Sequence, residues 1–265
     1  MKKTVFMLCG ILIIAGLAWG QTGVKKKRAL PHEFGNVLIN NHSDKAGIAP
    51  VQFEHWLHRS MFTCRLCHVD LAFAMKGGGS NIKAADNKKG FYCGSCHNGK
   101  TTVNGKQVFA SCQLPFPQEW SRNCERCHSV GRQVKFEYDF YAYTAKYPKE
   151  RFGNGINWEK AASDGVIKLT DAIEGISIKR APMKVQKDFT LTAKVAGMAD
   201  IIFSHEKHTI WSGCEGCHPE IFVGIKKGMT KYSMAEIYEG KYCGVCHINV
   251  AFPLLDCQRC HTKPV

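Results

Sequence analysis

The sequence predicts a fold of mostly coil with short α-helices, arranged as two tandem modules with little β-sheet. Three observations carry this prediction. The pattern Cys-x-x-Cys-His occurs six times in 265 residues. A longer pattern that holds three of these words recurs 150 positions further along the chain. About 41 residues of the chain beyond residue 20 accompany each word, too few to build an ordinary protein core around each of them.

The first expected element is an export signal at residues 1–20. The chain starts with MKK, continues with an apolar run over residues 4–18 and reaches Gly20 through small residues. A short basic start, an apolar stretch too brief to span a bilayer and a small-residue exit are typical of a secretory signal peptide. We expect cleavage after Gly20, with an uncleaved anchor as the alternative. The mature chain is expected in the periplasm, or at the outer surface or outside the cell, with no stable membrane span.

The six words are numbered first to sixth in chain order. Their cysteine pairs are Cys64/Cys67, Cys93/Cys96, Cys124/Cys127, Cys214/Cys217, Cys243/Cys246 and Cys257/Cys260. The histidines that follow them are His68, His97, His128, His218, His247 and His261. A zinc site does not need a histidine after every pair, and a thiol redox motif needs only one pair on a thioredoxin-like scaffold. Covalent haem attachment needs this order, because two cysteines bind the porphyrin edge and the adjacent histidine binds iron. The sequence predicts six covalently bound haem c groups.

The repeat extends beyond the words. The stretches FEHWLHRSMFTCRLCH and FSHEKHTIWSGCEGCH align without a gap, so that Phe53 matches Phe203. The offset of 150 holds through the second word of each copy and falls to 133 at the third, because the first copy carries 17 extra residues after His97. We expect a first module with an N-terminal extension at 21–128, a haem-free linker at 129–200 and a second module at 201–265.

The linker contains no histidine or cysteine. Asn157 before WEKAAS, with Gly165 behind it, predicts a short capped helix. Its Trp158 and several tyrosines are expected to pack against porphyrin edges rather than to relay electrons. Cys112, in the 17-residue surplus, has no partner within a word and is expected to be a quiet buried thiol, with a free or intermolecular thiol as the alternative.

Each iron needs a sixth ligand, and six histidines lie outside the words: His32, His42, His55, His58, His205 and His208. Four of them form two pairs with a spacing of three residues ahead of the first word of each copy. This spacing places both members of a pair on one side of a helical turn. A pair that merely caps a loop is the alternative to iron ligation.

The Phe-x-His-x-x-His segment followed by three words resembles the small triheme cytochromes of the c7 type, which are relatives of the tetrahaem c3 type. The resemblance covers residues 53–128 and 203–261. It implies four ligand pairs: His55 with His68, His58 with His97, His205 with His218, and His208 with His247. The resemblance also implies that the third haem of a module takes its sixth ligand from just before the second word, where Met234 stands for the haem of His261.

The first module departs from that pattern, because Ala84 occupies the position of Met234. The haem of His128 must find another ligand or stay open. His42 is our preferred candidate, and His32 and Met75 are the others.

Six haems on so short a chain are expected to serve as the core, with coil and short helices wrapped around them. Removing Lys2 and Lys3 with the signal lowers the formal charge from +14 to +12, and twelve haem propionates would add about −12. Each ferric bis-histidine centre adds about +1, so the oxidised protein is expected to be modestly cationic.

No nucleophile elbow, phosphate loop or zinc-protease motif occurs in the chain. We expect an exported electron-transfer cytochrome, not an enzyme, with other redox proteins as partners: cytochromes, or quinol-oxidising or outer-membrane complexes. Nucleic acid is not an expected partner. The alternatives are a subunit of a polymeric cytochrome filament for extracellular electron transfer and a multihaem reductase with one open haem.

Overall fold

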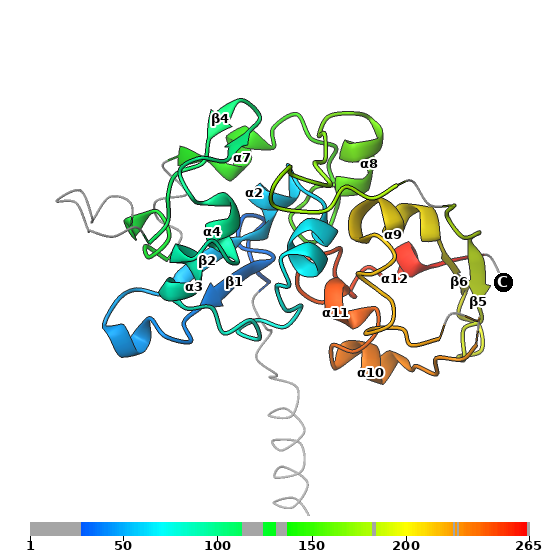
Figure 1. The fold of residues 1–265 in the computed structure, drawn as a ribbon. Coiled ribbons are helices and arrows are strands. Elements are labelled where there is room, and N and C mark those ends of the chain that lie inside the picture. The colour runs from blue at the N-terminus through cyan, green and yellow to red at the C-terminus, as the bar shows by residue number, and fades with distance from the viewer. Residues whose placement is uncertain are drawn as a thin grey trace, which may run out of the picture.

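The structure is a computed structural model, and it describes residues 28–112, 124–130, 137–181, 184–224, 226 and 228–263. Mostly coil and short helices make up this part of the chain, with small sheets of two or three strands, as the sequence predicts (Figure 1). The expected export signal at 1–20 lies outside the described residues. Within them, no helix is both long and apolar enough to cross a bilayer.

The first module opens with a hairpin and continues through short helices. Its elements are β1 (Asn36–Ile39), the 3-10 helix η1 (Asp44–Ala46), β2 (Val51–Glu54), α2 (His55–Arg59), the π-helix η2 (Leu66–Asp70), α3 (Ala84–Lys88), α4 (Cys93–Cys96), β3 (Thr102–Val103) and β4 (Lys106–Gln107). β1 and β2 pair antiparallel with Val37 opposite Phe53. β3 and β4 form a second small hairpin within the 17-residue surplus of this module.

The second module repeats this order. Its elements are β5 (Phe189–Leu191), β6 (Asp200–Phe203), α9 (His205–Ser212), α10 (Met234–Tyr238), α11 (Gly244–His247), α12 (Cys257–Cys260) and β7 (His261–Lys263). β5 and β6 pair antiparallel with Phe189 opposite Phe203, and β7 adds a third strand along β6. Because β5 belongs to this hairpin, the end of the segment assigned to the linker is structurally part of the second module.

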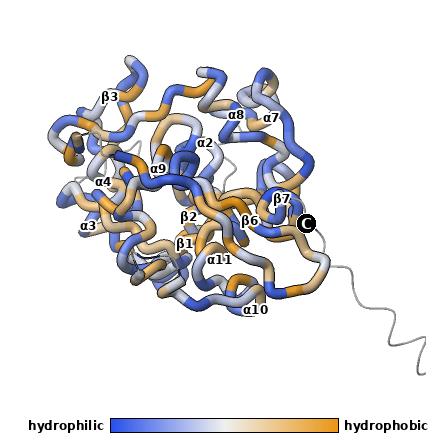
Figure 2. The backbone as a smooth tube through the Cα atoms, turned by 90° about the vertical axis from the view of Figure 1, so that its right-hand side faces the viewer, coloured by the Kyte–Doolittle hydropathy of each residue, from blue (hydrophilic) through white to orange (hydrophobic). Residues whose placement is uncertain are grey.

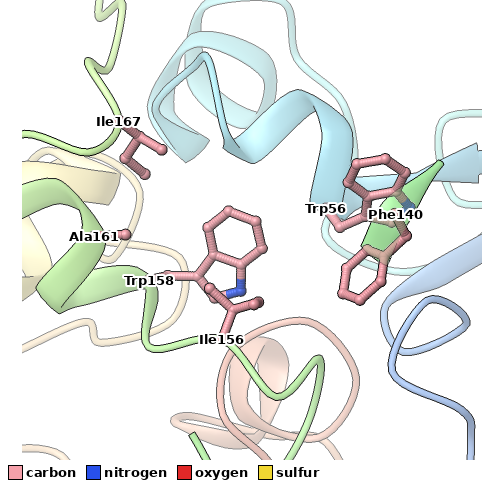
Figure 3. Packing of buried hydrophobic residues seen from close by; sticks show 6 residues of the cluster. All are labelled: Trp56, Phe140, Ile156, Trp158, Ala161 and Ile167. Atoms are coloured by element: carbon pink, nitrogen blue, oxygen red, sulfur yellow. The ribbon is translucent and has the colours of Figure 1, made fainter. Parts of the chain in front are cut away.

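The linker builds a protein core of its own. It contains α7 (Phe140–Tyr143) and α8 (Trp158–Ser163), and the Asn157 side chain accepts a hydrogen bond from the Lys160 N–H, which confirms the predicted capped helix. Trp56 of α2 packs with five linker residues: Phe140, Ile156, Trp158, Ala161 and Ile167 (Figure 3). Trp211 of α9 packs against the same cluster.

This cluster differs from the expectation that porphyrins alone form the core. The linker aromatics pack edge-to-face on one another, as Tyr147 does on Trp158 with ring centres 5.9 Å apart. Trp158, Tyr138 and Tyr143 also border the cavity described below, so that their packing against porphyrin edges stays a prediction. Aromatic side chains with few aliphatic neighbours gain most of their buried area from each other.

The two modules lie side by side, and the linker helices α7 and α8 run along one edge of both (Figure 1). A ladder of ion pairs, buried at Arg65 and Asp70 and exposed at Asp171 and Glu215, joins them. Arg65 of the first word pairs with Asp70 at 2.9 Å and with the linker's Asp171 at 2.6 Å. Arg180 of the linker pairs with Asp70 at 2.8 Å and with Glu215 of the fourth word at 2.6 Å.

Hydrophobic residues follow strands such as β6, and the residues of peripheral loops are more hydrophilic (Figure 2).

Candidate haem-binding sites

Each Cys-x-x-Cys-His word folds into a single tight turn. In five of the six words the histidine N–H donates to the carbonyl of the first cysteine, as His128 does to Cys124 at 2.7 Å and His247 to Cys243 at 3.0 Å. One helical turn brings residues i and i+3 to the same side. Both thiols of a word therefore face one edge of a site, with the histidine directly after them.

The second word of each module needs glycine between its cysteines. A Cβ on Gly94 would lie 1.9 Å from the Asn87 carbonyl oxygen, and a Cβ on Gly244 would lie 1.9 Å from the Ile237 carbonyl oxygen. Those carbonyls belong to α3 and to α10, so in each module a preceding helix lies directly against the word. This contact explains why Tyr-Cys-Gly-x-Cys-His occurs twice.

The Phe-x-His-x-x-His segment is a strand that runs directly into a helix. Phe53 is the next-to-last residue of β2, which ends directly before α2, and its ring lies 4.8 Å from the ring of His55 and 4.4 Å from that of His58. Phe203 of the second module lies 5.0 Å from His205 and 4.5 Å from His208. The phenyl ring limits the rotamers of both histidines, so that it orients the pair.

Three of the four expected histidine pairs face each other across a gap. The ring centres are 6.4 Å apart for His55 and His68, whose planes are within 5° of parallel. They are 6.5 Å apart for His58 and His97, and 6.2 Å for His208 and His247. Two imidazoles on opposite sides of one metal ion have ring centres roughly 6.3 Å apart, given a metal–nitrogen distance of about 2.0–2.1 Å and a ring radius of about 1.1 Å. The residues therefore fit bis-histidine haem iron.

The fourth expected pair is not brought together. Among the described residues His205 and His218 are not in ring contact; His205 Nδ1 lies 3.2 Å from the Lys187 carbonyl oxygen and His218 Nδ1 lies 2.6 Å from that of Phe222. Ligation of one iron by this pair stays a prediction.

Backbone carbonyl oxygens lie within hydrogen-bond distance of the Nδ1 atom of most histidines expected to bind iron. Nine Nδ1 atoms lie within 2.6–3.2 Å of a carbonyl oxygen: those of His55, His58, His68, His128, His205, His208, His218, His247 and His261. A bond from Nδ1–H to a carbonyl fixes the tautomer and leaves Nε2 with a free lone pair for a metal. Equivalent acceptors recur in both modules, as Ala49 for His128 and Ala199 for His261 show.

Burial keeps the imidazoles neutral, which is the form that binds metal. Burial, with smaller contributions from neighbouring histidines and arginines, lowers the pKa of His55, His97 and His247 to about 4. It also lowers the pKa of His58 and His208.

The two third-haem sites differ at the position of the sixth ligand. Met234 begins α10 and borders the cavity, and Ala84 begins the equivalent helix α3. The preferred candidate His42 is not in the cavity lining; its Nε2 lies 2.9 Å from Oδ1 of Asn81, a residue that does line the cavity.

The other two candidates for the iron of His128 lie apart from each other. His32 lies edge-on to Tyr141, with its Nδ1 3.2 Å from the tyrosine hydroxyl. Met75 lies in the cavity lining. The ligand opposite His128 stays a prediction.

One continuous cavity of about 2240 Å³ runs through both modules. Pockets for single small ligands are about 300–1,000 Å³. Its lining includes cysteines of all six words except Cys214, and five of the six attached histidines. The cavity therefore has room for several large groups held edge to edge.

The charges that affect the pKa of each thiol show which words lie near one another. Burial is the main cause of the raised pKa of the Cys67 and Cys127 thiols, at about 12, and the charge of Cys93 adds to both. In the second module Cys243 acts in the same way on Cys260, whose pKa is about 11. The second word of each module therefore lies next to the third, and in the first module it also lies next to the first.

The modules meet at the first word. Besides burial, the charge of Cys64 raises the pKa of Cys217 in the fourth word and of Cys246 in the fifth. A Cβ on Gly213, just before the fourth word, would lie 2.6 Å from Arg65 Cδ of the first word. The six sites therefore form one connected series across both modules.

Sequence reasoning missed Arg59, which lies at this junction. Burial lowers the pKa of Arg59 to about 10, while the thiols of Cys64 and Cys246 raise it. The one available signal was that the aligned residue in the second copy is the uncharged Thr209. The carbonyl acceptors of the histidines had no signal in the sequence, because any residue type can supply them.

Comparisons with known proteins agree with this site. The family model described as cytochrome c7 and related cytochrome c matches residues 51–129 and 201–262. No curated protein matches. Among solved structures, the chain is 36% identical to a c7-type three-haem cytochrome domain, over 29% of this chain and 95% of that one, with a TM-score of 0.26.

Larger solved structures are also similar. The chain is 25% identical to the C-terminal hexahaem fragment of a cytochrome, over 86% of this chain and 98% of that one, with a TM-score of 0.25. It is 24% identical to a dodecahaem cytochrome c, over 88% of this chain and 76% of that one, with a TM-score of 0.27. Because the family model covers more than half of the residues, the chain belongs to the family of cytochrome c7 and related c-type cytochromes, multihaem proteins that transfer electrons through covalently bound haem c.

Proposed function

We propose that this protein is an exported hexahaem cytochrome that carries electrons between redox proteins of the bacterial cell envelope. The observation that carries the proposal is the set of three imidazole pairs at 6.2–6.5 Å along one continuous cavity. Export is supported by the signal-like residues 1–20.

The residues of the chain hold the cofactor from two sides. Cysteine thiols of each word would form thioethers with one porphyrin edge, and the attached histidine would bind iron on one face. Bound haem supplies one-electron redox chemistry. His55, His58 and His208 would bind three irons on the opposite face, since their Nδ1 atoms are fixed on carbonyls and their Nε2 atoms are free.

The connected order of the words supports transfer along the whole chain. In this order the third word lies next to the second, the second next to the first, and the first next to the second module. Two ligands fixed by backbone hydrogen bonds let the iron change its charge with little movement of the protein.

We propose a carrier, not an enzyme, because all six words keep the attached histidine. Carbon monoxide tests this assignment, since it binds reduced haem only where the sixth position is open. A reduced parent protein that binds none, or binds only at the haem of His128 without turning over a substrate, agrees with a carrier. Steady reduction of a small oxyanion or nitrogen oxide at that haem would contradict it.

Haem count tests the core of the proposal. The mass of the intact mature protein should exceed that of the polypeptide by six haems, and a pyridine haemochrome assay should give about six haems per chain. Cys112→Ala is the matched control, because Cys112 lies outside every word and the variant should keep all six. Retention of zinc without haem would overturn the proposal.

A further inference from the structure

One contact between a histidine, a phenylalanine and an arginine occurs in both modules. In the first module the ring centre of Phe109 lies 4.4 Å from that of His97, with 58° between the ring planes. The guanidinium carbon of Arg126 lies 3.8 Å from the same phenyl ring centre. Phe109 therefore contacts the attached histidine of the second word and the arginine of the third word at once.

The second module builds the same contact from residues in a different register. The ring centre of Phe252 lies 4.2 Å from that of His247, with 55° between the planes, and 4.7 Å from the guanidinium carbon of Arg259. Phe252 follows its histidine by five positions, whereas Phe109 follows its own by twelve. The geometry is therefore kept although the spacing along the chain is not.

The arginine is one of two residues that equivalent words share between their cysteines. Identity there occurs only at Gly94 with Gly244 and at Arg126 with Arg259. The glycines are needed because a helix lies against each of them. That steric reason does not apply to an arginine, and the contact with phenylalanine supplies a different one.

Carboxylates of the linker anchor both guanidinium groups. Arg126 Nη2 donates to Glu137 at 2.6 Å, and Arg259 Nη1 donates to Glu150. Arginine can bind a carboxylate at the edge of its planar group and stack on an aromatic ring with its face. Each arginine therefore joins a phenyl ring at the cavity to a fixed point on the linker.

The histidine pairs at these contacts have twisted planes. The angle between the two imidazole planes is 55° for the pair of the second word and 62° for that of the fifth, against 5° for that of the first. Both twisted pairs include a histidine that Phe109 or Phe252 contacts. The orientation of the imidazole planes determines how the d orbitals of ferric iron split, so a ring that cannot rotate preserves this electronic structure.

We propose that Arg126 and Arg259 are positioning residues for electron transfer, each holding a phenyl ring against the axial imidazole of a neighbouring haem and so fixing the rotation of that imidazole about its bond to iron. This inference rests on the proposed haem content. The arginine of the third word acts in this way on the haem of the second word, and the arginine of the sixth word acts on the haem of the fifth.

The test is NMR of the oxidised holoprotein, in which the methyl shifts of each ferric haem report the orientation of its axial imidazoles. Arg126→Met keeps the aliphatic stem, and Phe109→Leu keeps the arginine and its charge. Both variants should change the methyl shifts of the haem of His97. The haem of His68 and the three haems of the second module should keep the shifts of the parent.

The second module provides an independent repeat and the linker a matched control. Arg259→Met and Phe252→Leu should change the methyl shifts of the haem of His247 and leave the first module as in the parent. Arg151 stacks on Phe152 with its guanidinium carbon 5.1 Å from the ring centre, and among the described residues neither lines the cavity. Arg151→Met should therefore leave all six haems unchanged.

A haem count for each protein separates this inference from the proposed function, because a parent without six haems would overturn the proposed function itself. With six haems present, unchanged shifts at the haem of His97 in both Arg126→Met and Phe109→Leu would overturn the inference. A change confined to the haem of His128, which belongs to the same word as Arg126, would overturn it too. A change in Arg126→Met without one in Phe109→Leu would assign the effect to charge, and the positioning role would fail.

Discussion

A histidine in this protein acquires its role from a backbone carbonyl. The carbonyl oxygen holds Nδ1, the ring is fixed, and Nε2 points away from the bond. His42 and His32 lack this arrangement. His42 uses Nε2 on Asn81, and His32 bonds the hydroxyl of Tyr141. A carbonyl at Nδ1 therefore separates nine of the ten expected ligand histidines of the words and of the two Phe-x-His-x-x-His segments from His42 and His32; the exception is His97, whose Nδ1 has no such partner.

Replacing His208 with alanine should open one haem. His208 faces His247 at 6.2 Å, so its loss removes one axial ligand and leaves the other in place. The reduced variant should bind one more carbon monoxide per chain than the parent, measured by optical titration. Glu206→Ala, which changes an exposed residue of the same helix, should bind no more than the parent. Equal binding by His208→Ala and the parent would show that another residue ligates the iron of His247.

Met234 should mark the haem of His261 by its potential. Thioether sulfur stabilises ferrous iron, and axial ligands move haem potentials over a range of about 0.8 V. The oxidised parent should show one weak sulfur-to-iron band in the far red, and Met234→Ala should remove this band together with the highest-potential step. Met75→Ala, in the first module, should leave both in place. A parent with no such band would assign Met234 to packing.

Short segments repeat between the modules more faithfully than their sequences do. Each module joins a two-stranded hairpin to a helix that opens with histidine, and each places a helix against the glycine of its second word. Of these shared features, the sequence showed only the Phe-x-His-x-x-His segment and the words. The hairpin strands NVLI and FTL are too short for an alternating pattern to separate them from coil.

The ion-pair ladder should contribute more to stability than any surface pair. The Asp70 side chain is only 4% exposed and pairs with both Arg65 and Arg180. Asp70→Asn would remove one carboxylate from Arg65 and from Arg180, which keep Asp171 and Glu215, so the cost should stay below the about 3–5 kcal/mol of a buried pair that loses its one partner. Thermal unfolding of the holoprotein should show a clear drop in Tm.

Asp164→Asn is the control for the ladder. Asp164 pairs with Lys160 on the exposed side of α8, where such a pair contributes about 0–1 kcal/mol. Equal Tm values for Asp70→Asn and the parent would mean that the two modules are held together by the apolar cluster alone.

At the scale of the whole molecule, haem should lower the isoelectric point. The polypeptide has a sequence pI near 9.2, and twelve propionates add about −12 when ionised. Isoelectric focusing should place the reduced holoprotein well below the oxidised one, because each ferrous bis-histidine centre carries about one positive charge less. A holoprotein that focuses near 9.2 in both states would indicate that far fewer haems are attached.

Sequence reasoning reached the words, the repeat and the capped linker helix, because each depends on residues close together in the chain. Sequence reasoning could not predict contacts between residues that lie about a hundred positions apart in the chain. The pair of Arg65 with Asp171 and the packing of Trp56 on Phe140 are of this kind. The expected core of porphyrins omitted the linker cluster, since aromatic composition alone does not show whether rings pack on a cofactor or on one another.

The packing of the linker on the two modules also bears on the order of steps in maturation. The Trp158 cluster and the ion-pair ladder draw together segments from residue 56 to residue 215, and burial raises the pKa of thiols such as Cys67 and Cys246 to about 12. A thiol held in that state is a poor nucleophile. We therefore expect haem attachment at these buried words to precede docking of the linker, whereas the exposed Cys214 and Cys257 stay accessible in the folded chain.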